Sequence, residues 1–463
     1  MFETKKNIFK MILWMGIFLL IMPIFSGCSQ KKSNKYKIDL EIWGVFDDNS
    51  DFAEIMSEYK KVNPFINKIV YRKFSVDSYK KELIDALASG NGPDIFLINN
   101  AWMPTFENKV SPAPSYLINE QSFRQNFVDV VADDFIGKNG EIYGVPLSVD
   151  SLALYYNKDL LNAAGISAPP TTWSELLEDS KKITKVDDFG NIIRSGISLG
   201  TAYNINRSTD IIDLLLFQQG ANLPTKNDTI FKSQYGIGDN VLSFYTQFAR
   251  SSSPAYSWNK RMHYSIDAFY EGNLAMMLNY SWHIKTIKNK NAKLNFGVSF
   301  LPQISKENPA NYANYWAFVV NKNKKINQLN DNKEYQISNE IRIGESWQFL
   351  KFLTFKNGGK FLTMNIKSKK TKEYPLEIDP TDVYLKKTKK PAARRDLIEK
   401  QKSDPELGPF VYGNLIAKTW YKKDSDYIET IWAEIIDDIN KGNITPQQAF
   451  QLVVSRINQV NSQ

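Results

Sequence analysis

The sequence predicts an α/β fold, and three observations in its N-terminal part point to that class. Residues 37–43 alternate between polar and apolar side chains, which is typical of a strand with one buried face. Residues 95–98 form a short continuous apolar run, which indicates a strand buried on both faces. Between these strands lie a helical pattern, a further strand and a second helical pattern. The resulting β-α-β-α-β order predicts a mostly parallel sheet with helices on both sides.

Helix and strand limits in this part follow from local signals. A helix is expected at 52–59 and a strand at 67–74. The next helix begins near Asp77 or Ser78, either of which can cap it, and it stops at the run from Gly90 to Pro93.

The rest of the chain carries further helix and strand signals. Thr172 and Glu175 form a capping box, in which each side chain binds the backbone amide of the other residue. Pro446 suits the first position of a last helix, because its fixed backbone angle is already helical. The other expected elements are a strand near 196–200, helices at 211–220 and 241–249, strands at 274–278, 295–302 and 315–321, and helices at 344–355 and 427–441.

Residues 1–27 are expected to form a lipoprotein signal peptide. Lysines precede and enter an apolar run from Ile8 to Phe25, and a lipobox-like Ser-Gly pair then precedes Cys28. After cleavage, Cys28 would carry acyl chains that anchor the protein, and residues 28–37 would form a polar tether. The alternative is an uncleaved membrane anchor, because the run is close to the ~17–25 residues that a span needs.

Composition narrows the classes of partner. The formal net charge is +8, but the lysines are scattered among acids, which is typical of a solvated surface. Residues 367–372 and 386–390 are the densest basic segments, and a role near anionic lipid is the alternative for them. The single cysteine excludes an intramolecular disulfide, and we find no nucleic-acid-binding motif. We expect a protein at the extracytoplasmic face of the membrane, lipid-anchored, or in the periplasm.

Ordered blocks of sequence carry a family resemblance. The most specific block runs from Asn139 to Thr184 and contains NGEIYGVPLSVDSLALYYNKDLL and AAGISAPPTTWSELLEDSKKIT. The others are IWGVFDD (42–48), SYKKELIDALASGNGPDIF (78–96), FYEGNLAMMLNYSW (269–282), NFGVSFLPQ (295–303), YWAFVVNK (315–322) and IWAEIIDDINKGNITPQQAF (431–450). Together they resemble the family 1 extracellular solute-binding proteins of ABC importers, and by pattern the maltose- and oligosaccharide-binding branch.

This resemblance implies a two-lobed periplasmic-binding-protein fold of type II, with hinged lobes and a central ligand cleft. The chain would cross between the lobes near Val149, Val319 and Glu373. Lobe 1 would then hold residues 38–148 and 319–373, and lobe 2 would hold residues 149–318 and 374–463. The implied function is capture of a carbohydrate, expected to be an oligosaccharide, by a monomer that delivers it to an ABC permease, with hinge closure around the ligand.

Acidic and amide side chains are the first candidates for contact with a sugar, because they pair with hydroxyl groups. Asp150 falls where the resemblance places an acidic ligand contact at the lobe crossing, and its alternative role is a hydrogen bond to the hinge backbone. Asp47 and Asp48 follow the first strand, where the edge of a parallel sheet opens onto a crevice, although either could instead cap the next helix. Asn99 and Asn100 end the 95–98 strand at the same edge, where they also suit a turn.

Aromatic side chains are the second candidates, because a flat ring can cover the apolar face of a sugar. Trp282 matches a position where the resemblance implies stacking on a sugar, and its alternative is core packing. Trp102 follows the 95–98 strand closely and is a further candidate platform. The weaker aromatic candidates, for which packing is the alternative, are Tyr203, Trp258, Trp316, Trp420 and Tyr421.

The sequence favours a binding protein over an enzyme, without cofactor or metal. The chain has two histidines, His263 and His283, and no HExxH, GxSxG, phosphate-loop or Cys/His motif. A secreted glycoside hydrolase is the enzyme alternative, since two carboxylates suffice for that chemistry. A second alternative is a binder of polyamines, or of another small polar solute such as a glycerol phosphodiester. Binding of a neutral oligosaccharide would be insensitive to salt, unlike binding of those charged solutes.

Overall fold

The structure is a computed structural model that describes residues 36–232, 234, 236–325 and 337–462. Ile38–Gln463 form one compact unit. The expected signal peptide, Cys28 and most of the tether lie outside the described residues. Among the helices in the described part of the chain, none has both the length and the apolar character that a membrane span needs.

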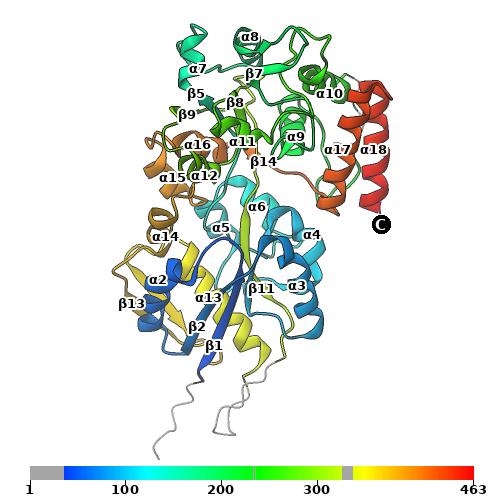
Figure 1. The fold of residues 1–463 in the computed structure, drawn as a ribbon. Coiled ribbons are helices and arrows are strands. Elements are labelled where there is room, and N and C mark those ends of the chain that lie inside the picture. Colours follow the sequence, from blue (N-terminus) through cyan, green and yellow to red (C-terminus); the bar gives the residue numbers. More distant parts are fainter. Residues whose placement is uncertain (1–35, 233, 235, 326–336, 463) are drawn as a thin grey trace, which may run out of the picture. The chain divides into compact units, whose positions relative to one another are not determined.

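Two five-stranded sheets divide the compact unit into two lobes (Figure 1). The sheet of lobe 1 has the order β2-β1-β3-β11-β4. Its strands are β1 (Ile38–Gly44), β2 (Ile66–Lys73), β3 (Ile95–Asn99), β4 (Val110–Ser111) and β11 (Trp316–Asn321). The first three strands are parallel, as the β-α-β-α-β order predicted, whereas β11 runs antiparallel to both β3 and β4.

The sheet of lobe 2 has the order β6-β7-β8-β5-β9 and is mostly antiparallel. Only the β7–β8 pair is parallel among its strand pairs. Its strands are β5 (Ala153–Asn157), β6 (Lys185–Val186), β7 (Ile192–Ile197), β8 (Leu274–Asn279) and β9 (Phe296–Ser299). Two small ladders complete the strands: β10 (Asn311–Tyr312) with β14 (Ala417–Lys418), and β12 (Lys360–Met364) with β13 (Thr371–Pro375).

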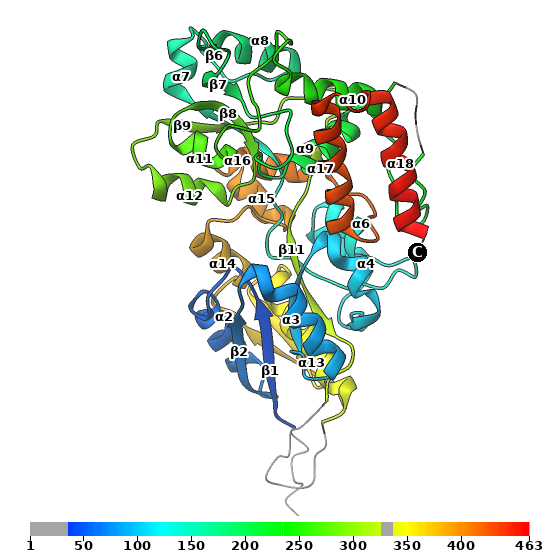
Figure 2. The same ribbon diagram turned by 45° about the vertical axis from the view of Figure 1, so that its right-hand side comes forward.

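The helices cover these sheets, and Figure 2 shows the two C-terminal helices side by side along lobe 2. Lobe 1 carries α2 (Asn49–Val62), α3 (Val76–Ser89), η2 (Asn100–Trp102), α4 (Met103–Phe106), η3 (Glu107–Lys109), α5 (Glu120–Asn126), α6 (Asp129–Phe135), α13 (Asn339–Thr354) and α14 (Pro380–Thr388). Lobe 2 carries α7 (Lys158–Ala163), α8 (Trp173–Ile183), α9 (Ser208–Gln218), α10 (Gly238–Thr246), η4 (Gln247–Ala249), α11 (Ser265–Tyr270), α12 (His283–Lys290), α16 (Gly408–Leu415), α17 (Ser425–Lys441) and α18 (Pro446–Ser462). α15 (Arg395–Gln401) lies between the lobes in sequence and packs against α5 and α16.

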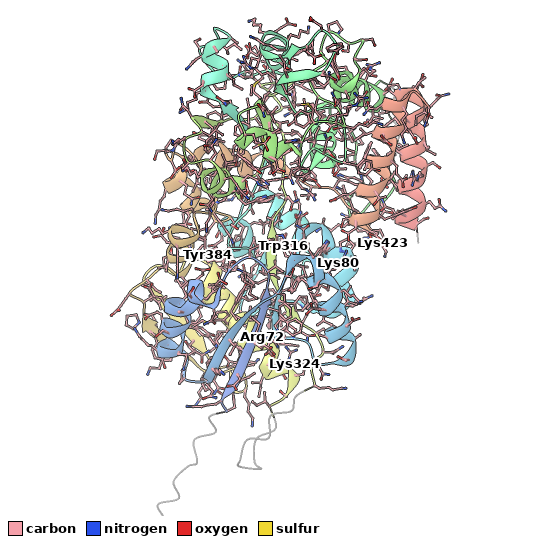
Figure 3. The ribbon with its side chains drawn as sticks, viewed as in Figure 1. Arg72, Lys80, Trp316, Lys324, Tyr384 and Lys423 are labelled. Carbon is pink, nitrogen blue, oxygen red and sulfur yellow. The ribbon has the colours of Figure 1, made fainter. Side chains whose placement is uncertain are left out.

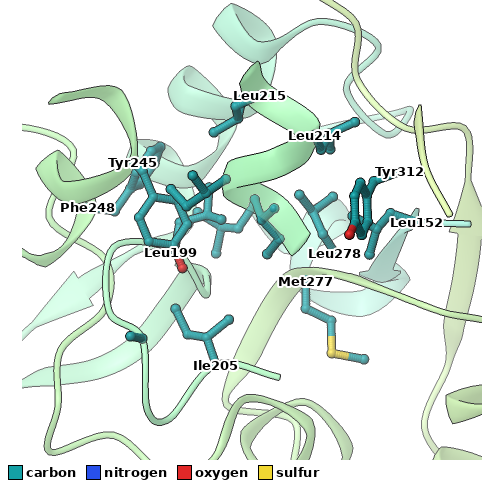
Figure 4. Packing of buried hydrophobic residues seen from close by; sticks show 14 of the residues in the cluster. Leu152, Leu199, Ile205, Leu214, Leu215, Tyr245, Phe248, Met277, Leu278 and Tyr312 are labelled. Carbon is teal, nitrogen blue, oxygen red and sulfur yellow. The ribbon is translucent and has the colours of Figure 1, made fainter. Parts of the chain in front are cut away.

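Local signals set the helix ends that the sequence predicted. α8 begins at the Thr172 capping box, in which the Glu175 amide donates to the Thr172 hydroxyl at 3.2 Å. α3 ends at Gly90, which has a left-handed φ of 76° that glycine adopts without strain. The core of lobe 2 contains residues of both α9 and β8, and Figure 4 shows Leu215 and Leu278 among its buried residues.

The chain passes between the lobes three times, and these segments lie side by side. Ser151 pairs with Ala313, and Ser148 pairs with Ala392. The third passage comes later than the position expected near Glu373. Glu373 lies within the β12–β13 hairpin, and α14 still packs against α2 and α13 of lobe 1. The chain therefore leaves lobe 1 only after α14, and the second passage at residues 313–315 precedes Val319, which is inside β11.

Candidate functional site

Asp47 and Asp48, which follow β1, have different roles. The side chain of Asp47 is 7% exposed and accepts hydrogen bonds from the Lys390 ammonium at 2.6 Å and the Tyr384 hydroxyl at 2.9 Å. Asp48 is the N-cap residue of α2, and its amide donates to the Asp51 carboxylate at 2.8 Å. Asp47 thus faces the third passage, whereas Asp48 has the capping role that was its alternative.

Asp150 lies in the first passage and is buried. One carboxylate oxygen accepts from the amide (3.0 Å) and the hydroxyl of Ser281, and the other accepts from the Ser151 amide at 3.0 Å. Burial raises the pKa of Asp150 to about 8, although these hydrogen bonds and the charge of Lys390 favour the carboxylate. Asp150 therefore joins the first passage to the end of β8. We call Asp47, Asp150, Ser281, Trp282 and Lys390 the hinge site.

Trp282 is the part of the hinge site that remains open to solvent. It follows β8, is 44% exposed, and stacks on Tyr280 with ring centres 4.5 Å apart and planes 17° apart. Tyr280 is fully buried, and its hydroxyl donates to Asp210 at 2.6 Å. The ring of Trp282 is thus supported from behind by a residue that the core holds in place.

Asp210, at the start of α9, connects this region to lobe 1. The Arg207 guanidinium donates to both of its carboxylate oxygens, at 2.7 and 2.8 Å. Burial would raise the pKa of Asp210, but the charge of Arg207 outweighs it and lowers that pKa. The Asn314 amide also donates to Asp210 at 3.2 Å, and the Asn99 amide donates to Asn314 at 2.9 Å. Asn99 therefore takes part in a hydrogen-bonded chain between the lobes.

The lobe 1 side presents an aromatic group around Trp316, the first residue of β11. Its ring lies 4.9 Å from that of Trp102 and 5.3 Å from that of Phe46, which is 49% exposed. Trp316 and Lys80 both lie at the end of lobe 1 nearest lobe 2 (Figure 3). The Lys80 ammonium is 4.9 Å from the centre of the Trp102 ring and 2.7 Å from Asp426 of α17. One face of Trp102 is therefore covered by an ion pair between the lobes.

A pocket of about 840 Å³ also lies between the lobes, and none of the hinge-site residues lines it. Three residues that the sequence suggested for binding line it: Asn100, Trp420 and Tyr421. The amide of Asn100 donates to Asp134 at 3.1 Å. We call this space the inter-lobe pocket.

Two direct contacts between the lobes cross the inter-lobe pocket. The Thr419 hydroxyl donates to the Asp134 carboxylate, and the Lys226 ammonium donates to the Ile136 carbonyl. Burial raises the pKa of Asp134 to about 6, against the effect of its hydrogen bonds. The residues of this pocket thus hold the two lobes to each other.

The structure corrects one of the weaker aromatic candidates, Trp258, and shows the surroundings of two others, Tyr203 and Trp420. Trp258 is fully buried in the core of lobe 2, where its indole N–H donates to the side-chain oxygen of Asn204 at 3.3 Å, so a solute cannot reach it there. Tyr203 is 68% exposed, and partial burial, followed by the charges of acids in the last turns of α17, raises its pKa. Trp420 is 8% exposed and packs on Phe231 as well as lining the pocket.

Sequence reasoning missed the partners of these acids. Lys390 ends the basic run at 386–390, which suggested only a surface role. Arg207 and Asp210 are spaced as an ion pair at a helix start, and that spacing is the signal that was available. Within the part of the chain that the structure describes, His, Cys, Asp and Glu form no cluster of three suited to a metal.

Comparison with known proteins gives a consistent family assignment. Residues 44–360 match the family model described as bacterial extracellular solute-binding protein. A maltotriose-binding protein of Pyrococcus abyssi is 24% identical over 65% of this chain and 59% of its own length. The sn-glycerol-3-phosphate-binding periplasmic protein UgpB of Salmonella typhimurium is 24% identical over 88% of both chains. The chain spans from 32% to 59% of the length of the first curated relatives that it matches.

Solved structures agree on the fold. The crystal structure of a cyclic α-maltosyl-1,6-maltose binding protein from Arthrobacter globiformis superposes with a TM-score of 0.69. The two sequences are 18% identical, and the superposition covers 92% of this chain and 99% of the Arthrobacter globiformis chain. This likeness confirms the expected two-lobed periplasmic-binding-protein fold.

Proposed function

The chain belongs to the bacterial extracellular solute-binding proteins, and on that premise we propose that it captures a neutral oligosaccharide at the hinge site. The observation that carries this proposal is the combination of an open aromatic face at Trp282 with buried acids that already have partners. An aromatic ring suits the apolar face of a sugar. Paired acids and hydroxyls suit its hydroxyl groups.

The charges around the hinge site favour a neutral solute over a charged one. Asp47 is paired with Lys390, and Asp210 is paired with Arg207, so these carboxylates are not free for a polyamine. The same two ion pairs engage Lys390 and Arg207, so these cations are not free to bind a phosphate group. Burial raises the pKa of Asp150, which disfavours a negative charge there, and its carboxyl oxygens already accept from Ser281 and Ser151.

The proposed mechanism is capture by closure about the three passages. A solute that contacts Trp282 and Asp150 from one lobe and the Trp316 group from the other stabilises the closed arrangement. The solute shifts the equilibrium between the open and closed forms only by the difference in its affinity for the two forms. Closure then presents a joint surface to an ABC permease, to which the protein delivers its solute without transforming it.

We also propose the cellular setting. Residues 1–27 act as a signal peptide, and acylated Cys28 anchors a monomer at the extracytoplasmic face of the membrane. Neither nucleic acid nor a cofactor takes part. The polyamine or glycerol-phosphate binder and the glycoside hydrolase are the alternatives that the following experiment separates.

The test is a thermal-shift and calorimetric screen of the detergent-solubilised protein with neutral oligosaccharides, spermidine and sn-glycerol 3-phosphate. A solute that binds the native state raises its melting temperature. We expect a neutral oligosaccharide to do so with little effect of salt, and to be recovered intact. Salt-sensitive binding of a charged solute, or cleavage of a glycan, would overturn the proposal.

Paired tryptophan variants locate the site within the protein. Trp282→Ala is expected to weaken oligosaccharide binding about tenfold, because it removes the apolar surface of the ring together with its stacking contact. Because Trp282 is 44% exposed, its loss leaves the fold intact. Trp420→Phe in the inter-lobe pocket is the matched control and keeps wild-type affinity. The reverse result would move the solute to the inter-lobe pocket.

A further inference from the structure

We propose that His283 is a positioning residue that holds the indole of Trp282, so that only the ring face is offered to a solute. This inference rests on the proposed function for the identity of the solute. Its geometry, however, is a property of the protein alone. The chain contains only two histidines, and the proposed function uses neither of them.

The geometry is a line of three contacts beside Trp282. The indole nitrogen of Trp282 lies 2.8 Å from Nε2 of His283. The same Nε2 lies 3.2 Å from the side-chain oxygen of Asn206, and the Asn206 nitrogen lies 2.8 Å from the Tyr264 hydroxyl. Together with the stack on Tyr280, these contacts hold the indole both from behind and at its edge.

The donors and acceptors allow only one consistent protonation of His283. An indole N–H can only donate, so Nε2 of His283 must accept, and the ring proton lies on Nδ1. Nε2 then has no proton to give to Asn206. The single lone pair of Nε2 is taken by the indole N–H, so the Asn206 side chain lies against this edge of the ring without a second full hydrogen bond to it, and its NH₂ donates to the Tyr264 hydroxyl.

The neutral ring that this arrangement requires agrees with the surroundings of His283. A charged imidazole would place an N–H opposite the indole N–H, where two donors meet. Nδ1 is buried without a hydrogen-bond partner among the described residues, so a second charge-stabilising contact is missing as well. Burial lowers the pKa of His283 to about 4. His283 is thus neutral at physiological pH.

The consequence for recognition is specific. With its N–H bound to His283, Trp282 does not donate to a solute hydroxyl and contributes through stacking alone. Tyr264, which is 39% exposed, ends the same line of contacts and extends this edge of the site. Loss of His283 would leave the indole free to rotate and would weaken binding without removing any group that touches the solute.

The test is nitrogen-15 NMR of the indole N–H groups in the full-length protein in detergent. The Trp282 resonance is identified by its absence in Trp282→Phe. In the wild type we expect it to be constant from pH 8 to about 5 and to shift with a midpoint near 4. In His283→Phe the shift with pH disappears and hydrogen exchange of that indole accelerates about tenfold or more, whereas His283→Gln, which retains an acceptor, restores much of the protection.

Two results would overturn the inference. One is an unchanged Trp282 resonance in His283→Phe, and the other is a midpoint near the ordinary histidine pKa of about 6.5. Maltotriose serves as the binding probe, and His283→Phe should weaken its binding several-fold with His283→Gln intermediate; equal affinity in all three proteins also contradicts the inference. If maltotriose and the other saccharides do not bind the wild type, the proposed function fails, while the indole resonances still decide the role of His283.

Discussion

The hinge site and the inter-lobe pocket both contain residues of the two lobes, but their side chains are used differently. In the hinge site, Asp47 binds Lys390 on the third passage, Asp150 on the first passage binds Ser281 after β8, and one ring face of Trp282 stays open. In the inter-lobe pocket, Thr419 and Lys226 of lobe 2 bind lobe 1 directly. The comparison indicates that an open surface whose charges are already paired within the protein suits binding of a neutral solute. Direct hydrogen bonds between the lobes instead suit control of their relative position.

The largest expected effect tests the pocket wall as a structural element. Lys422 and Asp213 form a buried pair at 2.6 Å, with side chains that are 2% and 0% exposed. Lys422→Met leaves the Asp213 carboxylate buried without a cation, which costs roughly 3–5 kcal/mol of unfolding free energy in urea denaturation. Lys422→Met combined with Asp213→Asn should recover part of this loss. A cost of less than about 1 kcal/mol would contradict the structural role.

The next effect tests charge compensation in the hinge site. Among the described residues, Lys390→Met leaves the Asp47 carboxylate with the Tyr384 hydroxyl as its donor, and we expect the unfolding free energy to fall by roughly 2 kcal/mol. Lys386→Met is the matched control in the same basic run. The Lys386 side chain is 75% exposed, so its ion pair with Asp382 contributes less than about 1 kcal/mol. Equal losses of unfolding free energy in both variants would show that the Lys390 ion pair stabilises the fold no more than an exposed one.

The pH dependence of stability tests the burial of Asp134. Because burial raises the folded pKa of Asp134 from 3.8 to about 6, the folded state holds the proton more tightly than the unfolded state. Stability from this group is therefore greatest below pH 4 and is lost as pH rises to about 6. After allowance for partial exposure, the change is roughly 1–2 kcal/mol.

The comparison with Asp134→Asn isolates that group, because other titrating residues cancel between the two proteins. The variant should show a flatter dependence of unfolding free energy on pH between 4 and 6. A parallel pair of curves would mean that Asp134 does not hold the proton.

The smallest effect concerns the ion pair of Lys80 with Asp426, which joins the lobes near Trp102. The side chains are 25% and 61% exposed, so water and salt screen the pair, and it contributes about 0.5 kcal/mol. A double-mutant cycle of Lys80→Gln and Asp426→Asn at low salt should give this coupling, and the coupling should vanish in molar salt. A coupling that persists in molar salt would indicate a buried contact instead.

Much of the fold could be predicted because its signals are local. The Thr172 capping box, the Gly90 stop and Pro446 at the start of α18 involve hydrogen bonds or backbone angles within a few residues. The order of the N-terminal strands and helices also follows from such patterns. The position of the third passage was not predictable, since α14 has no local feature that assigns it to lobe 1. Its packing on α2 decides that.

The candidate site was predicted less completely, for the same physical reason. Asp150 and Trp282 are brought into one region, and their neighbouring residues in sequence suggested both. Trp258 looks like a loop tryptophan in sequence, yet the core of lobe 2 encloses it. Asp48 and Trp102 follow their strands as expected, but a helix N-terminus and an ion pair determine what they contact.

The sequence by itself determined the class of fold, the family and most element limits, because these depend on side-chain periodicity, caps and turns over short distances. Tertiary structure alone decided which charges are compensated. Asp47 meets Lys390 across 343 positions, Asp134 meets Thr419 across 285, and Asp150 meets Ser281 across 131. Electrostatic partners are set by distance in space and by burial, and neither quantity exists until the two lobes have folded around their passages.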